Sequence, residues 1–132
     1  MLVWEAFDMW ERVVLVAVGG ALGALSRYGL QGLIADWRGP TVLGTFAVNI
    51  SGTLLLGLFL GLTEERWTAP YLARTAVAIG FLGAYTTFST LMFESVDLAE
   101  SGSFATAALN ICGSLLVGLS AMYAGLVIGR SI

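Results

Sequence analysis

Long apolar runs alternate with short polar connections along the whole chain. Four of the runs are long enough to cross about 30 Å of hydrocarbon, which takes roughly 20 helical residues. Because lipid offers no partner to an unsatisfied backbone group, each run is expected to be a helix. Charge enters the apolar runs only at Arg27 and Arg74, and Glu94 follows where the third helix leaves the membrane. The predicted helices cover residues 13–34, 41–62, 71–99 and 104–129.

The connections between these helices are too short to hold a second domain. Residues 1–132 are therefore expected to form a single membrane domain of the all-α class. Pro40 and Pro70 each lie just before a helix, where a missing N–H does little harm. Tryptophans near the helix ends are typical of interfacial anchors. They are Trp4, Trp10, Trp37 and Trp67.

Composition places the chain in a bilayer and excludes several function classes. Hydrophobic residues make up 58% of it and charged residues 11%, far from the values of a soluble domain. A net charge of −3 with six scattered arginines does not suit nucleic acid. One cysteine, Cys112, and no histidine exclude a disulfide framework and ordinary transition-metal sites. Glu5, Asp8 and Glu11 stand where a secretion signal carries basic residues, so an amphipathic lead-in to the first helix is expected.

The arginines give a small asymmetry between the two sides of the membrane. The side that holds both termini has four of them, and the other side has two. This bias favours cytoplasmic termini. A protein that inserts in both orientations would also show a bias this small, so one orientation and two both stay open. The first set is Arg12, Arg66, Arg74 and Arg130, and the second is Arg27 and Arg38.

Glycines recur at four-residue spacing on three of the helices, a pattern that lets helix backbones approach closely in lipid. Packing within one subunit explains any single pair. Four helices are nevertheless too thin a bundle to enclose a polar pathway alone, so the chain is expected to form a dimer. The pairs are Gly19 and Gly23, Gly57 and Gly61, and Gly125 and Gly129.

Amide and hydroxyl side chains share one face on the second helix and one on the fourth, because they are spaced by four residues. A hydroxyl commonly bonds back to its own helix. An unpaired amide in hydrocarbon is costly, so Asn49 and Asn110 must face protein, water or a ligand. Bonds between helices and a polar pathway are both open explanations. The two sets are Thr45, Asn49 and Thr53, and Thr106, Asn110 and Ser114.

No carboxylate lies in the central part of any predicted span. A path of amides, hydroxyls and one arginine suits a small anion better than a cation or a proton relay. Arg27 has two open roles. It either extends its charge to the membrane surface or raises the anion concentration in a vestibule.

The stretch "GFLGAYTTFST" (80–90) predicts a break in the third helix. Gly80 and Gly83 weaken a helix, and β-branched Thr86 and Thr87 disfavour it further. The threonine side chains can also satisfy backbone groups that a break would free. Glycine is common in intact membrane helices too, so an unbroken helix is the alternative.

Three segments together resemble the Fluc or CrcB family of fluoride channels. They are "GGALGALSRY" (19–28), "GTFAVNISGTLLLG" (44–57) and "GFLGAYTTFSTLMFES" (80–95). The resemblance implies an antiparallel, dual-topology homodimer in the cell membrane, with two fluoride pathways and a third helix broken near its middle, at about 83–87. It also implies a structural sodium ion at the dimer centre, held by the backbone carbonyls of Gly83 and Thr86.

The resemblance assigns individual residues to the fluoride pathway. The family's pore asparagine falls on Asn49 and its arginine on Arg27. The first of its two pore phenylalanines falls on Phe88, whose electropositive ring edge suits an anion. The second is replaced by Leu91, which has no such edge, unless Phe93 or another aromatic compensates. Further polar positions fall on Thr87, Ser89, Thr90, Ser114 and Asn110, the last where some relatives have a tyrosine.

The sequence thus predicts a passive fluoride-selective channel that reduces fluoride toxicity, with fluoride, sodium, lipid and a second copy as partners. A small proton-coupled multidrug exporter is one alternative, but it needs a carboxylate in the membrane, typically in the first span, and residues 13–34 have none. A non-transporting assembly subunit is the other, and it leaves the asparagines without a role. The sequence contains no buried acid–base pair and no nucleophile of the kind an enzyme would need, so an enzyme is not expected.

Overall fold

The computed structural model describes residues 8–65 and 71–132, and within these ranges all regular structure is helical. Trp4, Glu5, Arg66, Trp67 and Pro70 lie outside the described residues. In chain order the elements are α1 (Met9–Arg38), α2 (Leu43–Glu65), α3 (Tyr71–Arg74), the π-helix η1 (Thr75–Leu82), α4 (Gly83–Tyr85), α5 (Phe88–Glu100) and α6 (Phe104–Ser131).

Four helical stretches of the described chain are long and apolar enough to cross a membrane. Each stretch ends beyond its predicted C-terminal limit, and the first also begins earlier, whereas the second begins at Leu43, two residues later than predicted. Local capping sets the ends of α1. The side chain of Asp8 accepts a hydrogen bond from the Trp10 N–H at the start of α1, and Gly39, with a φ of 80°, follows its last residue. The stretches are Met9–Arg38, Leu43–Glu64, Tyr71–Glu100 and Phe104–Ser131.

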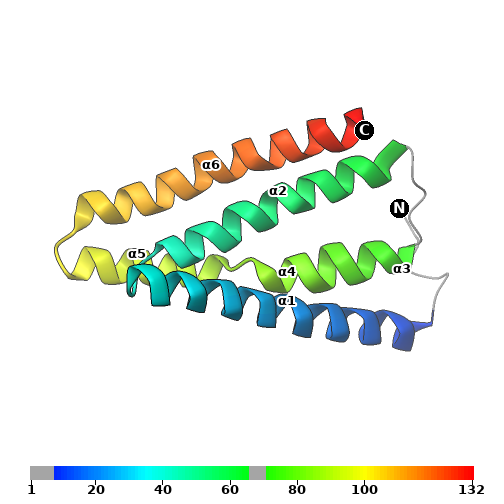
Figure 1. The fold of residues 1–132 in the computed structure, drawn as a ribbon, viewed down its shortest axis with the longest axis horizontal. Coiled ribbons are helices and arrows are strands. Elements are labelled where there is room, and N and C mark those ends of the chain that lie inside the picture. The colour runs from blue at the N-terminus through cyan, green and yellow to red at the C-terminus, as the bar shows by residue number, and fades with distance from the viewer. Residues whose placement is uncertain (1–7, 66–70) are drawn as a thin grey trace.

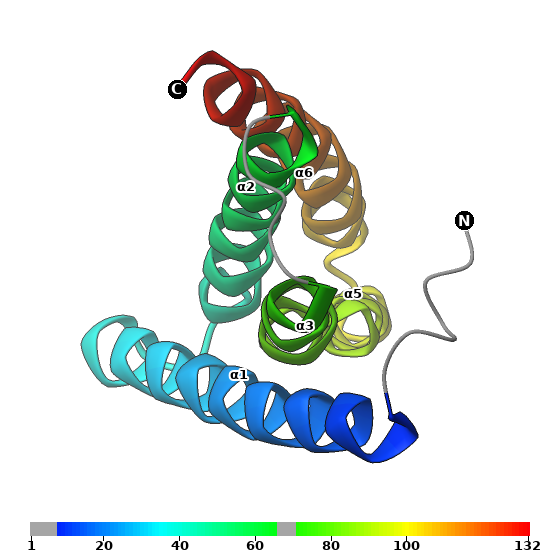
Figure 2. The same cartoon turned by 90° about the vertical axis from the view of Figure 1, so that its right-hand side faces the viewer.

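The helices pack as two pairs, and the third span belongs to one pair and reaches the other through α5. Helix α2 lies along α6, while α1 lies against η1 and α4 (Figures 1 and 2). Helix α5 contacts α6 on the other side of the break. The beginning of α1 and the end of α6 lie at the same end of the molecule, as an even number of spans requires (Figure 1).

The glycine pairs are used inside the protomer. A Cβ added to Gly57 would lie 2.5 Å from the Met122 carbonyl oxygen, and one added to Gly129 would lie 2.5 Å from the Leu58 carbonyl oxygen. On α1, a Cβ at Gly23 would overlap the backbone of Phe81. Backbones therefore touch along α2 and α6 and along α1 and η1, as expected where apolar surface gives no drive to associate in lipid.

The third span is wound irregularly and then interrupted. Thr75–Leu82 form a π-helix, α4 ends at Tyr85, and α5 begins at Phe88. Thr86 and Thr87 between them are extended, with ψ angles of 156° and 113°. A π-helical segment next to an extended pair is typical of a functional position in a helix.

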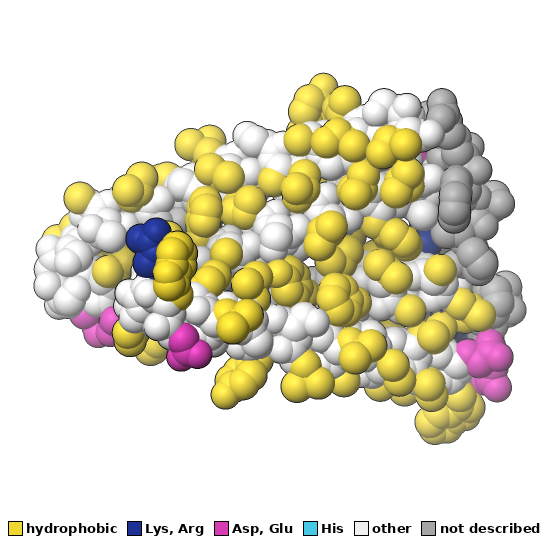
Figure 3. All heavy atoms as spheres, viewed as in Figure 1, with side chains coloured by type: hydrophobic (Ala, Val, Ile, Leu, Met, Phe, Trp, Pro, Cys, Tyr) yellow, Lys and Arg dark blue, Asp and Glu magenta, His cyan; other side chains and the backbone are white. Residues whose placement is uncertain are grey.

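Polar side chains lie inside the protomer and large apolar ones cover its outside. Among the described residues the buried polar side chains are Thr45, Thr75, Thr87, Ser95, Asn110 and Ser114. Exposed leucines, valines and aromatic rings cover the middle of the face in Figure 3, and charged side chains lie toward its ends. Trp10 and Trp37 are exposed near opposite ends of α1, and the Arg38 guanidinium lies 4.3 Å from the centre of the Trp37 ring. This polarity fits a protein whose solvent is lipid.

Replacing Gly125 by alanine is expected to loosen the α2–α6 pair, because the new methyl group would overlap the backbone of Leu54. Overpacking of this kind costs about 1–3 kcal/mol. Gly113→Ala on the same helix is the matched control, since its Cβ meets nothing within 4 Å. Thermal unfolding of the purified protein in detergent measures both. Equal unfolding midpoints for the two variants would contradict the packing described above.

Candidate functional site

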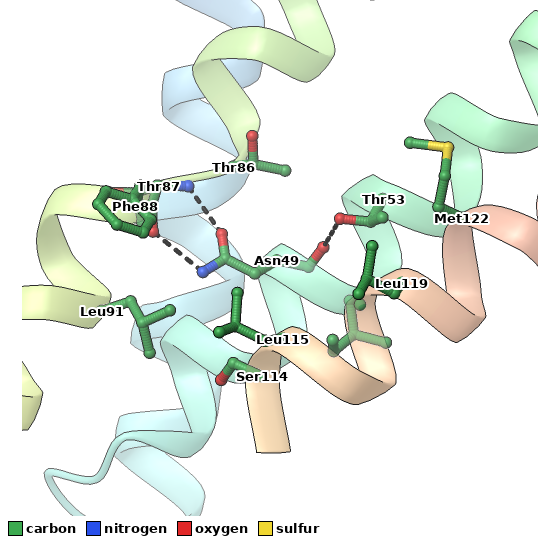
Figure 4. A pocket seen from close by; sticks show the side chains of 12 residues that line it. Asn49, Thr53, Thr86, Thr87, Phe88, Leu91, Ser114, Leu115, Leu119 and Met122 are labelled. Atoms are coloured by element: carbon green, nitrogen blue, oxygen red, sulfur yellow. Dashed lines mark hydrogen bonds between the residues drawn. The ribbon is translucent and has the colours of Figure 1, made fainter. Parts of the chain in front are cut away.

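A groove of about 330 Å³ opens beside the break in the third span (Figure 4). Helix α2 supplies one wall, the break and the start of α5 a second, and α6 the third. Its polar part is Asn49, Thr53, Thr86, Thr87 and Ser114. Its apolar part is Ile50, Phe88, Leu91, Leu115, Leu119 and Met122, with Gly118 between them.

Asn49 holds the break with both ends of its amide. Its Oδ1 accepts a hydrogen bond from the Thr87 N–H at 2.7 Å, and its Nδ2 donates to the Thr87 carbonyl oxygen at 3.0 Å (Figure 4). One partner is a donor and the other an acceptor, so the pair fixes which way the amide is turned. One N–H of the amide remains for a further acceptor.

Thr87 in turn caps α5. Its Oγ1 accepts a hydrogen bond from the Thr90 N–H at 3.3 Å and lies 2.9 Å from the Thr90 hydroxyl. The Ser89 hydroxyl is 3.3 Å from the same oxygen. Three hydroxyls thus gather at the N-terminus of a 13-residue helix, the end that carries the positive pole of the helix dipole.

The two positions matched to pore phenylalanines lie in opposite environments. Both residues line the groove, but Phe88 is 69% exposed whereas Leu91 is 4% exposed. A ring edge is therefore available at the first position alone. Phe93, on the same helix, is exposed and is not among the described residues that line the groove.

The fourth-span residues separate. Ser114 lines the groove, and no group of the described residues hydrogen-bonds to its buried Oγ. Asn110, one turn earlier, lines a different groove between α2 and α6 and donates to the Ser95 hydroxyl at 3.0 Å. The Ser95 hydroxyl donates to the Leu91 carbonyl. Asn110 thus joins α6 to α5, the interhelical role that was one of its open explanations.

Arg27 lies on α1, which contributes no side chain to the groove among the described residues. Its side chain is half-buried. Gly83 is exposed at the start of α4, and Thr86 bonds back to the Leu82 carbonyl through both its N–H and its hydroxyl, at 3.2 and 3.1 Å. The structure therefore brings Asn49, Thr87 and Ser114 together at the break and leaves Arg27 apart from them.

A second polar cluster escaped sequence analysis. The Thr45 hydroxyl donates to Glu94 Oε1 at 2.6 Å and accepts from Gln31 Nε2 at 3.1 Å, joining three helices. Thr45 is 1% exposed, and the other Glu94 oxygen is buried without a hydrogen-bond partner among the described residues. The sequence placed Glu94 at the membrane exit. One feature of the sequence pointed toward this cluster: Thr45 shares a helix face with Asn49, so it was expected to face other helices.

Chemically, the groove offers neutral donors and a ring edge. Within residues 8–65 and 71–132 no group of three or more histidine, cysteine or carboxylate side chains could hold a metal ion. The arrangement can solvate a small anion through hydrogen bonds, and it lacks the acid–base pair that bond-breaking chemistry would need.

Comparison with known proteins agrees with this arrangement. The family described as "CrcB-like protein, Camphor Resistance (CrcB)" matches residues 14–126. A protein of Maridesulfovibrio salexigens named fluoride-specific ion channel FluC is 43% identical over 123 residues, which is 92% of this chain and 98% of that protein. The FluC proteins of Nitrobacter winogradskyi and Nitratidesulfovibrio vulgaris are 42% and 44% identical, over 93% and 91% of this chain and 98% of each.

The matched span begins early in α1 and ends near the end of α6, so it takes in all four membrane helices and the groove at the break. With identity above 40% over nine-tenths of the chain, the likeness extends far beyond the three motifs. The chain belongs to the CrcB family.

Proposed function

We propose that the chain is a fluoride-selective channel that lets fluoride leave the cell passively and so reduces its toxicity. The relatives named above are fluoride-specific ion channels. The observation that supports this function most directly is the groove at the break, where an oriented amide, a helix N-terminus and the Ser114 hydroxyl lie together. That hydroxyl has no hydrogen-bond partner among the described residues. Such a channel is a multi-pass cell-membrane protein and not an enzyme.

Fluoride is small and holds its water strongly, so a selective path must replace that water with several short hydrogen bonds. The remaining Asn49 N–H, the hydroxyls around Thr87 and the Ser114 hydroxyl supply such donors. None of them carries a full charge, so no single contact holds the ion too tightly for it to leave. The edge of Phe88 adds a weak electropositive contact.

A second copy is needed to complete the path. Phe88 and Gly83 are exposed on the protomer, and the groove is open to its surface. An antiparallel homodimer would place a partner over these groups, and the weak arginine bias is compatible with insertion in both orientations. The remaining apolar surface contacts lipid.

The residues at the break fit a hard cation such as sodium. In an unbroken α-helix the Gly83 carbonyl would accept from the Thr87 N–H, and the Thr86 carbonyl from the Thr90 N–H. Both N–H groups are donated to side-chain oxygens instead. The two carbonyls keep acceptor capacity for an oxygen-coordinated ion. A sodium ion bound there would supply a fixed positive charge at the dimer centre, between the two subunits.

The rival functions fit less well. A proton-coupled drug exporter needs a carboxylate within the first span, and residues 13–34 contain none. Glu94 lies near the end of the third span and its Oε1 is held by Thr45. A scaffold subunit would require only the glycine contacts and would leave the groove at the break without a purpose.

Proteoliposomes loaded with fluoride are expected to release it when a potassium ionophore balances charge, and to retain chloride under the same conditions. The expectation follows from a path built for an ion small enough to be enclosed by neutral donors. An ion-selective electrode measures both fluxes. Equal chloride release, or no fluoride release, would falsify the proposed selectivity.

Phe88→Ile is expected to lower fluoride flux at least tenfold while the protein still assembles, because an aliphatic side chain has no electropositive edge. Phe93→Ile is the matched control: Phe93 is as exposed and on the same helix but lies outside the groove. Its flux should stay at the wild-type level. Equal losses in both variants would show that Phe93 supplies a ring to the path, and no loss in either would remove Phe88 from it.

Dual topology is tested by labelling one introduced cysteine at the C-terminal end. In a Cys112→Ser background, a membrane-impermeant maleimide added to intact cells should label roughly half of a Ser131→Cys variant, since both orientations are populated. Permeabilised cells give the total. Labelling of nearly all or nearly none of the protein in intact cells would establish one orientation and exclude the antiparallel dimer.

A further inference from the structure

We propose that Asn49 and Thr87 are the positioning residues of the cation site: their side-chain oxygens take the two backbone N–H groups that would otherwise occupy the carbonyls of Gly83 and Thr86. This inference rests on the proposed function and adds to it. It gives two residues assigned to the anion pathway a second role on the cation side of the break.

The first substitution of partners occurs at Thr87. Its N–H lies four residues after the Gly83 carbonyl, the ordinary spacing of an α-helical bond. It is donated across to Asn49 Oδ1 at 2.7 Å, the shortest of the bonds that Asn49 makes with the break. The side chain comes from α2, so a residue remote in sequence releases the carbonyl on α4.

The second substitution of partners occurs at Thr90. Its N–H lies four residues after the Thr86 carbonyl, which would be its partner in an unbroken helix. It is donated instead to Thr87 Oγ1 at 3.3 Å. Thr87 is 7% exposed and its hydroxyl is also bonded to that of Thr90, so the acceptor is held in place. For each of the two carbonyls, one side-chain oxygen therefore accepts the N–H that would bond to that carbonyl in an unbroken helix.

The arrangement stabilises an open break as well as a free carbonyl. A buried N–H without a partner is destabilising, so without these oxygens the chain would regain a helical bond to the carbonyl. The two states compete for the same N–H group. A side chain that cannot accept a hydrogen bond should shift the balance toward the helical bond and away from cation binding.

The test measures sodium binding through stability and needs no flux. The unfolding midpoint of the purified dimer is recorded while sodium replaces N-methylglucamine at constant ionic strength, since an ion that binds only the folded dimer raises the midpoint. Wild type should rise with sodium. Thr87→Val should need at least tenfold more sodium for half of that rise, while Thr87→Ser, which keeps the acceptor, should behave as wild type.

Thr53→Val is the matched control, because Thr53 lines the same groove but its hydroxyl donates to the Asn49 carbonyl of its own helix. It should keep the wild-type sodium response. A Thr87→Val response equal to that of wild type and Thr53→Val would overturn the proposal, and so would a wild type that does not respond to sodium.

If Thr87→Val does not fold, the same sodium titration is made with variants of Asn49, which test the Gly83 carbonyl. Asn49→Asp keeps an oxygen for the Thr87 N–H and Asn49→Leu has none. A sodium response retained by the first and lost by the second supports the proposal, and equal responses overturn it. Fluoride flux of the wild type is measured separately. Absence of fluoride flux would refute the channel, whereas flux without any sodium response would leave the channel standing and refute the cation site together with the positioning role.

Discussion

The rest of this structure depends on one interaction, the pair of hydrogen bonds between the Asn49 amide and the backbone N–H and C=O of Thr87. A helix cannot be interrupted in hydrocarbon unless the freed N–H and C=O groups find partners inside the protein. One primary amide satisfies a donor and an acceptor together. It allows Thr86 and Thr87 to be extended in the middle of a span, and the extended pair separates α4 from the N-terminus of α5.

The distribution of polarity follows from this constraint. Buried threonines, serines and Asn110 occupy the interior, where all except Ser114 hydrogen-bond to another helix or to a carbonyl of their own helix among the described residues, and large apolar side chains face outward. Close contact between helices then cannot come from an apolar core. Glycines bring the backbones of α2 and α6 together, and those of α1 and η1, so that dispersion and backbone proximity replace the hydrophobic effect.

Several residues of the groove at the break could be anticipated from residue types, and the structure separates residues of the same type. Asn49 and Asn110 occupy equivalent positions in the two polar repeats, yet the first holds the break and the second bonds to Ser95 between α5 and α6. Leu91, at the position that the resemblance matches to a second pore phenylalanine, is buried, while Phe88 is exposed. Spacing along a helix gives the face on which a residue lies, but the neighbour that meets that face depends on how the helices cross.

The sequence by itself determined that the chain is all-helical with four spans, because apolar length and the need to satisfy the backbone in lipid leave no other arrangement. It also indicated the region of the break, since glycines and β-branched threonines weaken a helix locally. Only the tertiary structure decided which N–H groups leave the helix, that Glu94 joins Thr45 and Gln31, and that the glycine pairs act within one protomer. These are contacts between residues tens of positions apart, and no local pattern encodes the distance between two helices.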